Sequence, residues 1–435
     1  MVIWSAVFYE AWKRTEVRLA VYWGQIDFEE DETERVEFHG IWRRSPIDDD
    51  KEFYFSYIKR ACRMVMAGSI TLFMIGLVIL SFYAQLELRS YLYDEFEGEW
   101  FLNYTITIVS TINAVQIMIF NQIYNYLAFL MTRYENHKTS SAFEMSLIAK
   151  TFIFQFVNSF NSIFYIAFLK REWEGCLNEN SSGDLTVSKD HTCTRELYGQ
   201  LRSIFIVAII KNVIEISTPL ITNWLKKRKK SKFYKKLQEN ERDSSMLLIR
   251  CEKQMDRGIY AFKDIDGTYY DYLELMIQTG YILLFGIAFP LCCLLAFINN
   301  IIEHQVDRAK VVYFVRRPSP IGASTIGIWR VIIYFISIIG IFTYAGVLCL
   351  TSETFSSNDD DKFIQFIWCS IISAVVRWCI AFLIPDVPRK FNIILRRHSY
   401  VVGKFLVGLP EASNDDEVLN DKTQLSVHTK LDCKY

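Results

Sequence analysis

Long stretches without charged residues recur along the chain, and short clusters of charged residues separate them. Each stretch meets or approaches the ~20 apolar residues that an α-helix needs to cross the hydrocarbon core of a bilayer. The pattern predicts an all-α fold, a polytopic transmembrane helical bundle of about eight complete spans. These spans are expected at about residues 64–86, 101–132, 147–169, 197–225, 271–290, 291–310, 328–352 and 362–386.

The charged clusters orient the spans, because Lys and Arg concentrate on the cytoplasmic side of membrane proteins. The strongest cluster is the run KKRKKSKFYKK at Lys226–Lys236, which we place inside. The loop before the 197–225 span then faces outward, and it contains Cys176, Cys193 and a glycosylation sequon at Asn180. These features fit an oxidising compartment and a Cys176–Cys193 disulfide. The alternative is two free thiols beside a chance sequon.

The uncharged run between Glu274 and Glu303 has basic segments on both sides, so an even number of crossings is required. The run is too short for two spans of ~20 residues each, unless both helices extend over the neighbouring acids Asp271 and Asp307. We therefore predict a helical hairpin with a turn or kink near Pro290. The alternative is one tilted span of about 42 Å, which would place the two acidic pairs on opposite sides of the membrane.

A third polar group interrupts the 197–225 span, where Lys211, Asn212 and Glu215 lie at a similar depth to the acidic pairs. The i,i+3 and i,i+4 spacings place each set on one helix face. Carboxylates gathered in a membrane need a counter-charge to stay ionised. Oxygen donors from three helices suit calcium, and the lack of suitably placed Cys or His disfavours zinc and copper. In the alternative, Lys211 and protons neutralise the acids as an ion-pair network.

Several segments occur in the order found in one known family. They are WKRTEVRLAVYWGQIDFEEDE, RYENHKTSSAFEMSLIAKTFIFQFVNSFNSIFYIAFLK, DYLELMIQTGYILLFGIAFPL, AFINNIIEHQVDRAKVVYFVRRP, IGIW and FLIPDVP. From about Trp4 to Pro388 the chain therefore resembles the anoctamins. This resemblance implies a homodimer that acts as a calcium-activated chloride channel, a phospholipid scramblase, or both.

The resemblance also implies a ligand set for calcium, namely Asn212, Glu215, Asp271, Glu274, Asn299, Glu303 and Asp307. The chain departs from the family pattern at Lys211, where the family has an asparagine ligand. A fixed cation there is expected to weaken calcium binding or to replace part of it. A second calcium site of the family is matched at Glu10 and Asp386 but has Ala381 at its remaining position, so this site lacks one ligand.

The resemblance further divides the chain into three regions. Residues 1–57 are expected to hold part of the family's second transmembrane helix and a cytoplasmic loop, without the cytosolic domain and first helix that precede them in the family. Residues 58–388 are the expected transmembrane domain. Residues 389–435 are the expected cytoplasmic C-terminal helix and a polar, disordered tail.

Two of the spans carry more polar residues than lipid-facing helices tolerate. Gln155, Asn158, Ser159 and Ser162 follow i, i+3, i+4, i+7 spacing and form one stripe. Such a stripe also serves to join helices by hydrogen bonds. By resemblance, two facing stripes form a groove for lipid headgroups or anions, lined by Asn103, Thr107, Thr111, Asn113, Gln116, Gln155, Asn158, Ser159 and Ser162.

Composition narrows the function further. The chain is 51% hydrophobic with a net charge of −1, which indicates a membrane protein and gives no sign of nucleic-acid binding. No nucleophile motif or phosphate-binding loop stands out, so an enzyme is not expected. We predict a calcium-regulated multi-pass protein of the plasma membrane or an endomembrane that scrambles phospholipids, conducts chloride, or both. The alternatives are a proton- or cation-coupled secondary transporter and a non-conducting tether or regulatory subunit.

Overall fold

A computed structural model describes residues 1–26, 28, 32–46, 49, 51–95, 99–179, 185–188, 193–211, 214, 217, 221, 261–262, 265–266, 268–316, 322–351 and 359–405. Within helices, the side chains of residues 92–95, 99–107, 110, 314, 359 and 360 are not described. The chain divides into two compact units, Met1–Pro385 and Asp386–Tyr435. Each unit is considered by itself.

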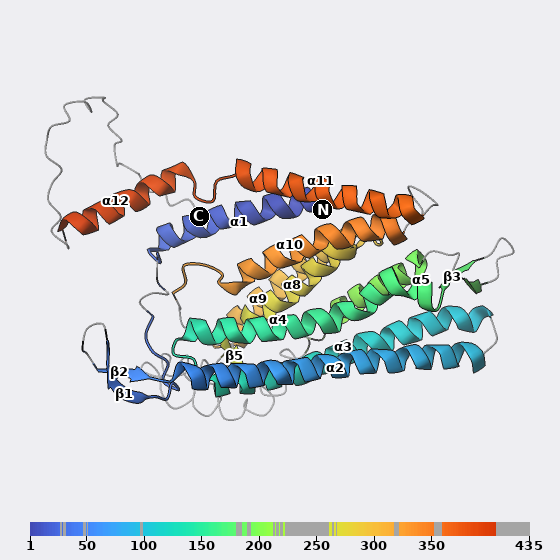
Figure 1. The fold of residues 1–435 in the computed structure, drawn as a ribbon, viewed down its shortest axis with the longest axis horizontal. Helices are drawn as coiled ribbons and strands as arrows, with labels where there is room; N and C mark the ends of the chain where they lie inside the picture. Colours follow the sequence, from blue (N-terminus) through green and yellow to red (C-terminus); the bar gives the residue numbers. More distant parts are fainter. Residues whose placement is uncertain are drawn as a thin grey trace, which may run out of the picture. The chain divides into compact units, whose positions relative to one another are not determined.

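The larger unit is a bundle of α-helices (Figure 1). The α-helices are α1 (Val2–Trp23), α2 (Tyr57–Glu95), α3 (Glu99–Glu135), α4 (Ser140–Phe164), α5 (Lys170–Trp173), α8 (Thr268–Phe285), α9 (Cys292–Ala309), α10 (Ile328–Gly346) and α11 (Asp359–Leu383). Three π-helical turns continue them, η1 (Tyr165–Leu169), η2 (Lys310–Phe314) and η3 (Val347–Thr351). Residues 194–211 are also helical.

Three short antiparallel hairpins connect the helices. They pair β1 (Ile41–Arg44) with β2 (Lys51–Tyr54), β3 (Cys176–Glu179) with β4 (Leu185–Ser188), and β5 (Ala261–Phe262) with β6 (Ile265–Asp266). None of them was predicted, because strands of two to four residues leave little periodic signal in a sequence.

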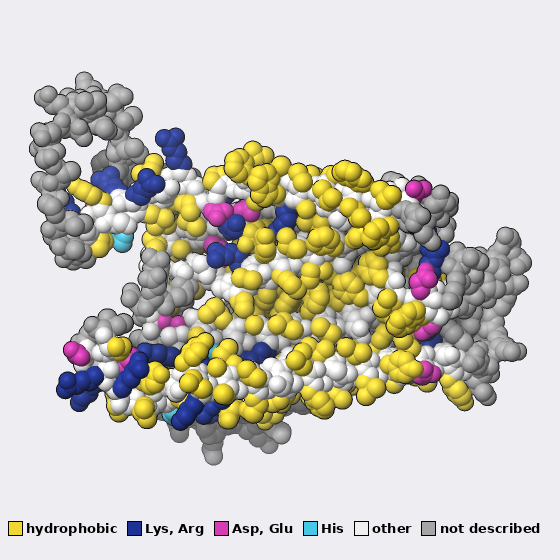
Figure 2. Space-filling view, viewed as in Figure 1, with side chains coloured by type: hydrophobic (Ala, Val, Ile, Leu, Met, Phe, Trp, Pro, Cys, Tyr) yellow, Lys and Arg dark blue, Asp and Glu magenta, His cyan; other side chains and the backbone are white. Residues whose placement is uncertain are grey.

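Among the described residues, 5 helices are long and apolar enough to cross a membrane. They are Tyr57–Tyr91, Thr111–Glu135, Ser140–Trp173, Ile328–Thr351 and Asp361–Leu383. Figure 2 shows the matching surface, with hydrophobic side chains across the middle of the visible face of the larger unit. The expected all-α membrane bundle is therefore confirmed.

Several helices extend beyond their expected spans. The clearest case is α4, which begins at Ser140, whereas the apolar run that predicted it begins at residue 147. Thr139 caps this start, because its hydroxyl accepts a hydrogen bond from the Ala142 amide at 3.3 Å. The helix thus starts in a polar segment that hydropathy alone does not reveal.

The 268–309 segment is the predicted helical hairpin. The helix α8 ends at Phe285, the chain turns through residues 286–291, which include Pro290, and α9 begins at Cys292. The Asn299 side-chain amide donates to Gln278 Oε1 at 3.0 Å, and Gln278 Nε2 donates to Asn300 Oδ1 at 2.6 Å. These bonds hold α9 against α8. The structure thus contains two helices joined by a turn instead of one continuous helix, and their crossing of the membrane stays a prediction.

Close packing fixes α8 against its neighbours α4 and α10. A Cβ atom added to Gly280 of α8 would lie 2.7 Å from the Phe160 ring of α4. A Cβ atom added to Gly340 of α10 would lie 3.2 Å from the Leu283 carbonyl oxygen. Small residues of this kind let membrane helices approach each other closely. They fix the position of α8, which carries Asp271 and Glu274.

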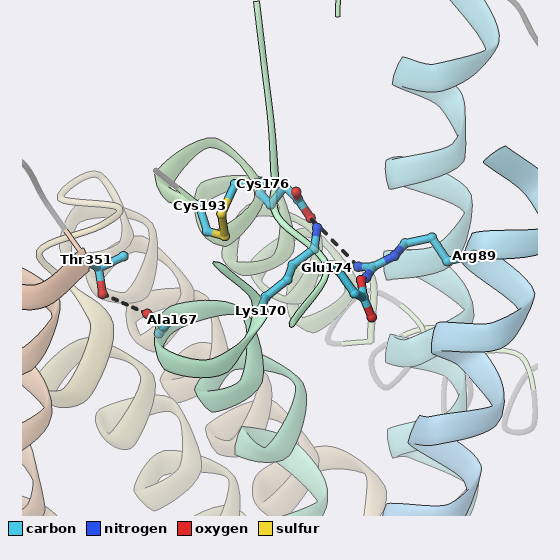
Figure 3. The surroundings of a disulfide bond; sticks show 8 residues. Arg89, Ala167, Lys170, Glu174, Cys176, Cys193 and Thr351 are labelled. Carbon is cyan, nitrogen blue, oxygen red and sulfur yellow. Dashed lines mark hydrogen bonds and ion pairs between the residues drawn. A yellow bond between two sulfur atoms is a disulfide. The ribbon is translucent and has the colours of Figure 1, made fainter. Parts of the chain in front are cut away.

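One end of the larger unit is held by a disulfide and ion pairs. Cys176 and Cys193 form a disulfide, with their Cα atoms 4.9 Å apart, and so the structure contains the bond that the sequence left open. Figure 3 shows it beside Lys170, with the ion pair of Arg89 and Glu174 close by. This end joins α2 and α4 to the helical segment 194–211.

Two further contacts tie the start of segment 194–211 to the same end. Glu196 is buried and forms ion pairs with Lys170 and, at 3.8 Å, with Arg89. Buried charges of this kind are stable only when they are paired. The segment that leads to Lys211 is therefore anchored at its first turn.

The smaller unit contains α12 (Arg389–Phe405) among its described residues. This helix lies in the region where a cytoplasmic C-terminal helix was expected. Residues 406–435, which were expected to form a disordered tail, lie outside the described part of the chain.

Candidate functional site

A large cavity in the described part of the larger unit has a volume of about 490 Å³. It lies among α3, α4, α8 and the helical residues that follow Cys193. One part of its wall is polar and uncharged, and another part carries three charged residues, Lys211, Asp271 and Glu274. The cavity therefore brings together the two regions that the sequence singled out, the polar stripe and the acidic pair of the hairpin.

The uncharged part of the wall comes from α3 and α4. Its polar side chains are Asn121, Gln122 and Asn125 of α3 and Gln155 and Ser159 of α4. Gln155 Nε2 donates to Asn125 Oδ1 at 3.0 Å, so two of these residues are bonded to each other. The α4 residues lie four positions apart and therefore share a helix face, as the sequence predicted.

The Asn158 side chain joins α4 to α3. Its Nδ2 donates to the Asn121 side chain at 2.8 Å and to the Ile117 carbonyl oxygen at 3.0 Å. Asn158 is buried and is absent from the cavity lining. At this position the helix-joining role, which the sequence left as an alternative, is the one that the hydrogen bonds show.

A second, smaller cavity of about 40 Å³ lies nearer the disulfide. Asn113 and Ser162, two of the predicted groove residues, line it and are hydrogen-bonded at 3.0 Å. The buried residues Arg89 and Glu196 line it as well. The predicted groove residues are thus divided between two cavities, and Asn158 bonds to Ile117, which lies between Asn113 and Asn121 along α3.

The remaining predicted groove residues take no part in either cavity lining. Thr111 is exposed and Gln116 is half-buried on α3. The side chains of Asn103 and Thr107 lie outside the described residues. The groove therefore stays a prediction, and only part of its residues line a cavity in the described structure.

The charged part of the large cavity contains one ion pair between helices. Lys211 Nζ donates to Glu274 Oε2, which joins the 194–211 segment to α8. Asp271 lies one turn before Glu274 and lines the same cavity, so the pair shares a face as its spacing predicted. The Lys211 side chain is 52% exposed and that of Glu274 is 20% exposed, so this pair is open to solvent from the cavity.

The acidic residues of α9 lie apart from this cavity lining. Asp307 pairs with Lys310 at 3.1 Å, one turn along the same helix, and Glu303 is half-buried. Asn299 is 2% exposed and contacts the cavity only indirectly, through its hydrogen bond to the lining residue Gln278. The hairpin therefore brings α8 and α9 together, while their acids face different surroundings.

The predicted calcium ligands fit the ion in their chemistry, because they are all carboxylate or amide side chains. Asn212 and Glu215 lie outside the described residues. In the part of the chain that the structure describes, no group of three or more His, Cys, Asp or Glu side chains is close enough to hold a metal ion. The calcium site stays a prediction.

The second predicted calcium site is divided between the two units. Glu10, in α1, is buried and forms an ion pair with Lys13 at 3.1 Å. Asp386 is exposed and belongs to the smaller unit, and Ala381 is exposed on α11. In the described structure the Glu10 carboxylate thus pairs with a lysine of its own helix.

Several cavity residues were not predicted, although their spacing along the helices indicates them. Asn125 lies four residues after Asn121, and Gln278 lies four residues after Glu274. Each extends a polar helix face by one turn. Tyr281, which also lines the cavity, gives no such signal, because an aromatic residue in an apolar span reads as core.

The chain is similar in sequence to one family of known proteins. A family model described as "Anoctamin: Calcium-activated chloride channel" matches residues 1–398. Anoctamin-4 of Homo sapiens is 33% identical over 371 residues, which cover 81% of this chain and 38% of that protein. Anoctamin-3 of Mus musculus is 33% identical over 370 residues, covering 81% of this chain and 36% of that protein.

A third relative is matched over a larger share of its length. Anoctamin-10 of Mus musculus is 27% identical over 407 residues, which cover 91% of this chain and 57% of that protein. The chain thus spans less than two thirds of the length of each of these relatives.

Proposed function

Because the chain belongs to the anoctamin family, we propose that it is a membrane transport protein that moves phospholipids, chloride, or both across a membrane under the control of calcium. The observation that carries this proposal is the large cavity, where a polar wall from α3 and α4 meets Lys211, Asp271 and Glu274. The polar surface supplies a path for a charged solute. The acidic residues beside it supply a place where a cation can bind and act on that path.

The proposed path starts in the large cavity and leads toward the smaller one near the disulfide. Asn121, Asn125 and Gln155 offer amide donors and acceptors to a headgroup or an anion in the first part. Asn113 and Ser162 continue this polarity in the smaller cavity. Asn158 bonds to the Ile117 carbonyl oxygen of α3, which lies between Asn113 and Asn121 along that helix, so we place the narrowest part of the path there.

The residues proposed to hold calcium are Asn212, Glu215, Asp271, Glu274, Asn299, Glu303 and Asp307. Calcium would supply the positive charge that lets carboxylates on neighbouring helices approach one another. Without that charge, the carboxylates of α8 and α9 repel Glu215 and the helix that carries it. The conformation with these helices close together is then less populated, and the shape of the polar path beside them changes.

Lys211 modifies this control, because it places a permanent ammonium group against Glu274. Part of the negative charge of the acidic site is therefore neutralised before any ion binds. A pair that is this open to solvent contributes little energy, so Lys211 is expected to allow the helices to close in a small fraction of molecules without calcium, but not to replace calcium. It also competes with calcium for Glu274, so we expect weaker binding than an asparagine at this position would give.

The proposed protein is a homodimer of multi-pass subunits in the plasma membrane or an endomembrane. Its disulfide end faces the oxidising side and its basic loops face the cytoplasm. The proposed function includes no enzymatic chemistry.

Purified protein reconstituted into liposomes tests the proposal. Flip of fluorescent phospholipids and flux of chloride are measured with calcium present and after its chelation, for the wild type and for Glu274→Gln. We expect at least one of the two activities to depend on calcium, and Glu274→Gln to need more calcium. Flux that does not depend on calcium but depends on an imposed gradient of protons or another solute would indicate a secondary transporter. The absence of both activities would indicate a tether or regulatory subunit.

A further inference from the structure

The helix α12 has two chemically distinct faces. At about 100° per residue, most of its apolar side chains gather in one arc, which His398 interrupts, while Ile393 and Tyr400 lie in the opposite arc. This apolar face consists of Phe391, Ile394, Leu395, Val401, Val402 and Phe405. The opposite arc is the basic face, with Arg389, Lys390, Arg396, Arg397 and Lys404, and the helix contains no Asp or Glu.

Much of the apolar face is exposed in the structure. Ile394 is 40% exposed, Val401 is 42% exposed and Phe405 is 74% exposed. Burial of these apolar side chains away from water is favourable. Contact of this face with an apolar medium or partner is therefore favoured over its exposure to water. A helix that combines a narrow apolar face with a lysine- and arginine-rich face is typical of segments that lie in the surface of a membrane.

The position of α12 in the chain places it next to a membrane. Residues 384–388 alone separate it from α11, whose segment Asp361–Leu383 is one of the candidate spans. At up to about 3.6 Å per residue, this link reaches less than about 20 Å. The α11 helix begins with Asp359, Asp360 and Asp361, while basic residues follow its end, so the positive-inside rule places α12 on the cytoplasmic side.

We propose that α12 binds the anionic phospholipids of the cytoplasmic leaflet. The helix lies in the plane of the interface, with its apolar face at the level of the first acyl carbons and its basic face among the phosphate groups. The cytoplasmic leaflet carries the negative charge that the basic face complements. An acidic groove on a soluble protein would offer similar chemistry, but the short link to α11 keeps α12 at a leaflet in every molecule, whereas such a protein would have to be recruited.

The test is hydrogen exchange of the α12 amides in the full-length protein, measured by mass spectrometry in lipid nanodiscs. One set of nanodiscs contains phosphatidylcholine alone, and the other contains phosphatidylcholine with phosphatidylserine. No other protein is added. We expect α12 to exchange several-fold more slowly in the phosphatidylserine nanodiscs and to lose this protection at high salt, because salt screens charge pairing at a surface.

Two variants separate the proposal from other causes of protection. Arg396→Glu with Arg397→Glu reverses charge on exposed positions of the basic face and should abolish the effect of phosphatidylserine. Phe391→Arg with Arg397→Phe keeps the composition and net charge of the helix but puts a guanidinium into the apolar face. It should lose protection as well, whereas attraction of bulk charge alone would leave it protected.

Three results would overturn the proposal. The first is equal protection of α12 in both kinds of nanodisc, which would mean that the helix packs on its own chain. The second is full protection of the Phe391→Arg, Arg397→Phe variant. The third is exchange that slows only when a cytosolic protein such as an acidic helix-binding protein is added, which would identify a protein as the occupant.

Discussion

Two carboxylates of the same bundle, Glu135 and Glu274, occupy opposite environments. The Glu135 side chain is 0% exposed, and its Oε2 lies 2.7 Å from Lys150 Nζ, 2.7 Å from the Ser146 hydroxyl and 2.8 Å from His137 Nε2. Glu274 faces the large cavity, and its described ion pair is with Lys211, a long side chain that is more than half exposed.

The difference separates a structural charge from one suited to binding. Glu135 is enclosed by its own chain, so its partners are fixed and no ion can reach it. The Glu274 pair is solvated, and exchange of Lys211 for another cation costs little. The number of fixed partners and the presence of a cavity, and not the residue type, therefore single out Glu274 as the candidate binding residue.

The largest effect is expected from Glu135→Gln, which leaves Lys150 without its buried counter-charge. Breaking one partner of a buried pair typically costs about 3–5 kcal/mol. Thermal unfolding of the purified protein in detergent should show a large loss of stability. Glu144→Gln, which changes an exposed carboxylate of α4, is the matched control and should unfold like the wild type. Equal stability of both variants would remove the distinction between the two environments.

The next effect is expected from Glu274→Gln, which removes charge from the cavity and leaves the fold intact. We expect the calcium concentration for half-maximal transport to rise about tenfold, which corresponds to about 1.4 kcal/mol of binding energy. The same sample should unfold at nearly the wild-type temperature. A variant that unfolds early would show that Glu274 is structural, like Glu135.

Asn158→Ala tests an intermediate case, because Asn158 Nδ2 has two fixed partners on α3 but the residue lies beside the cavity residues Gln155 and Ser159. Loss of its bridge to α3 should lower stability by about 1 kcal/mol, the usual net contribution of a hydrogen bond. It should also raise transport in the absence of calcium, because the proposed narrow part of the path loses the side chain that joins α4 to α3. Asn161→Ala on the same helix is the control. Unchanged calcium-free transport would place the narrow part elsewhere.

The smallest effect is expected from Lys211→Asn. Removing a solvated pair worth less than about 1 kcal/mol should lower the calcium needed for half-maximal transport about two- to fivefold. Transport in the absence of calcium should fall at the same time, because the built-in counter-charge is lost. Dose–response curves in liposomes measure both values. A calcium response identical to that of the wild type would mean that Lys211 does not act on the site.

Much of the fold can be predicted from the sequence, because the membrane imposes simple rules. The uncharged runs gave the helices, and the basic residues on both sides of the 275–302 run gave the hairpin. Both inferences rest on the cost of charge in hydrocarbon, which is large compared with any single packing contact. The start of α4 at Ser140 and the short hairpins depend on local capping and turn contacts, which are weaker and were missed.

The site was less predictable, because its partners come from different helices. The spacing of Asp271 and Glu274 placed both on one face, but nothing in it showed that Lys211 would pair with Glu274. The cluster around Glu135 was missed for the same reason, since His137 lies in a loop and Ser146 and Lys150 lie on α4. Helical periodicity identifies residues that share a helix face, but it does not show which faces of different helices are in contact.

The most direct test is calcium binding to the purified wild-type protein and to Glu274→Gln, measured with radiolabelled calcium at equilibrium. We expect saturable binding to the wild type and binding about tenfold weaker to the variant, a difference of about 1.4 kcal/mol. No saturable binding to the wild type, or the same affinity in both proteins, would contradict a cation-binding role for the cavity carboxylates.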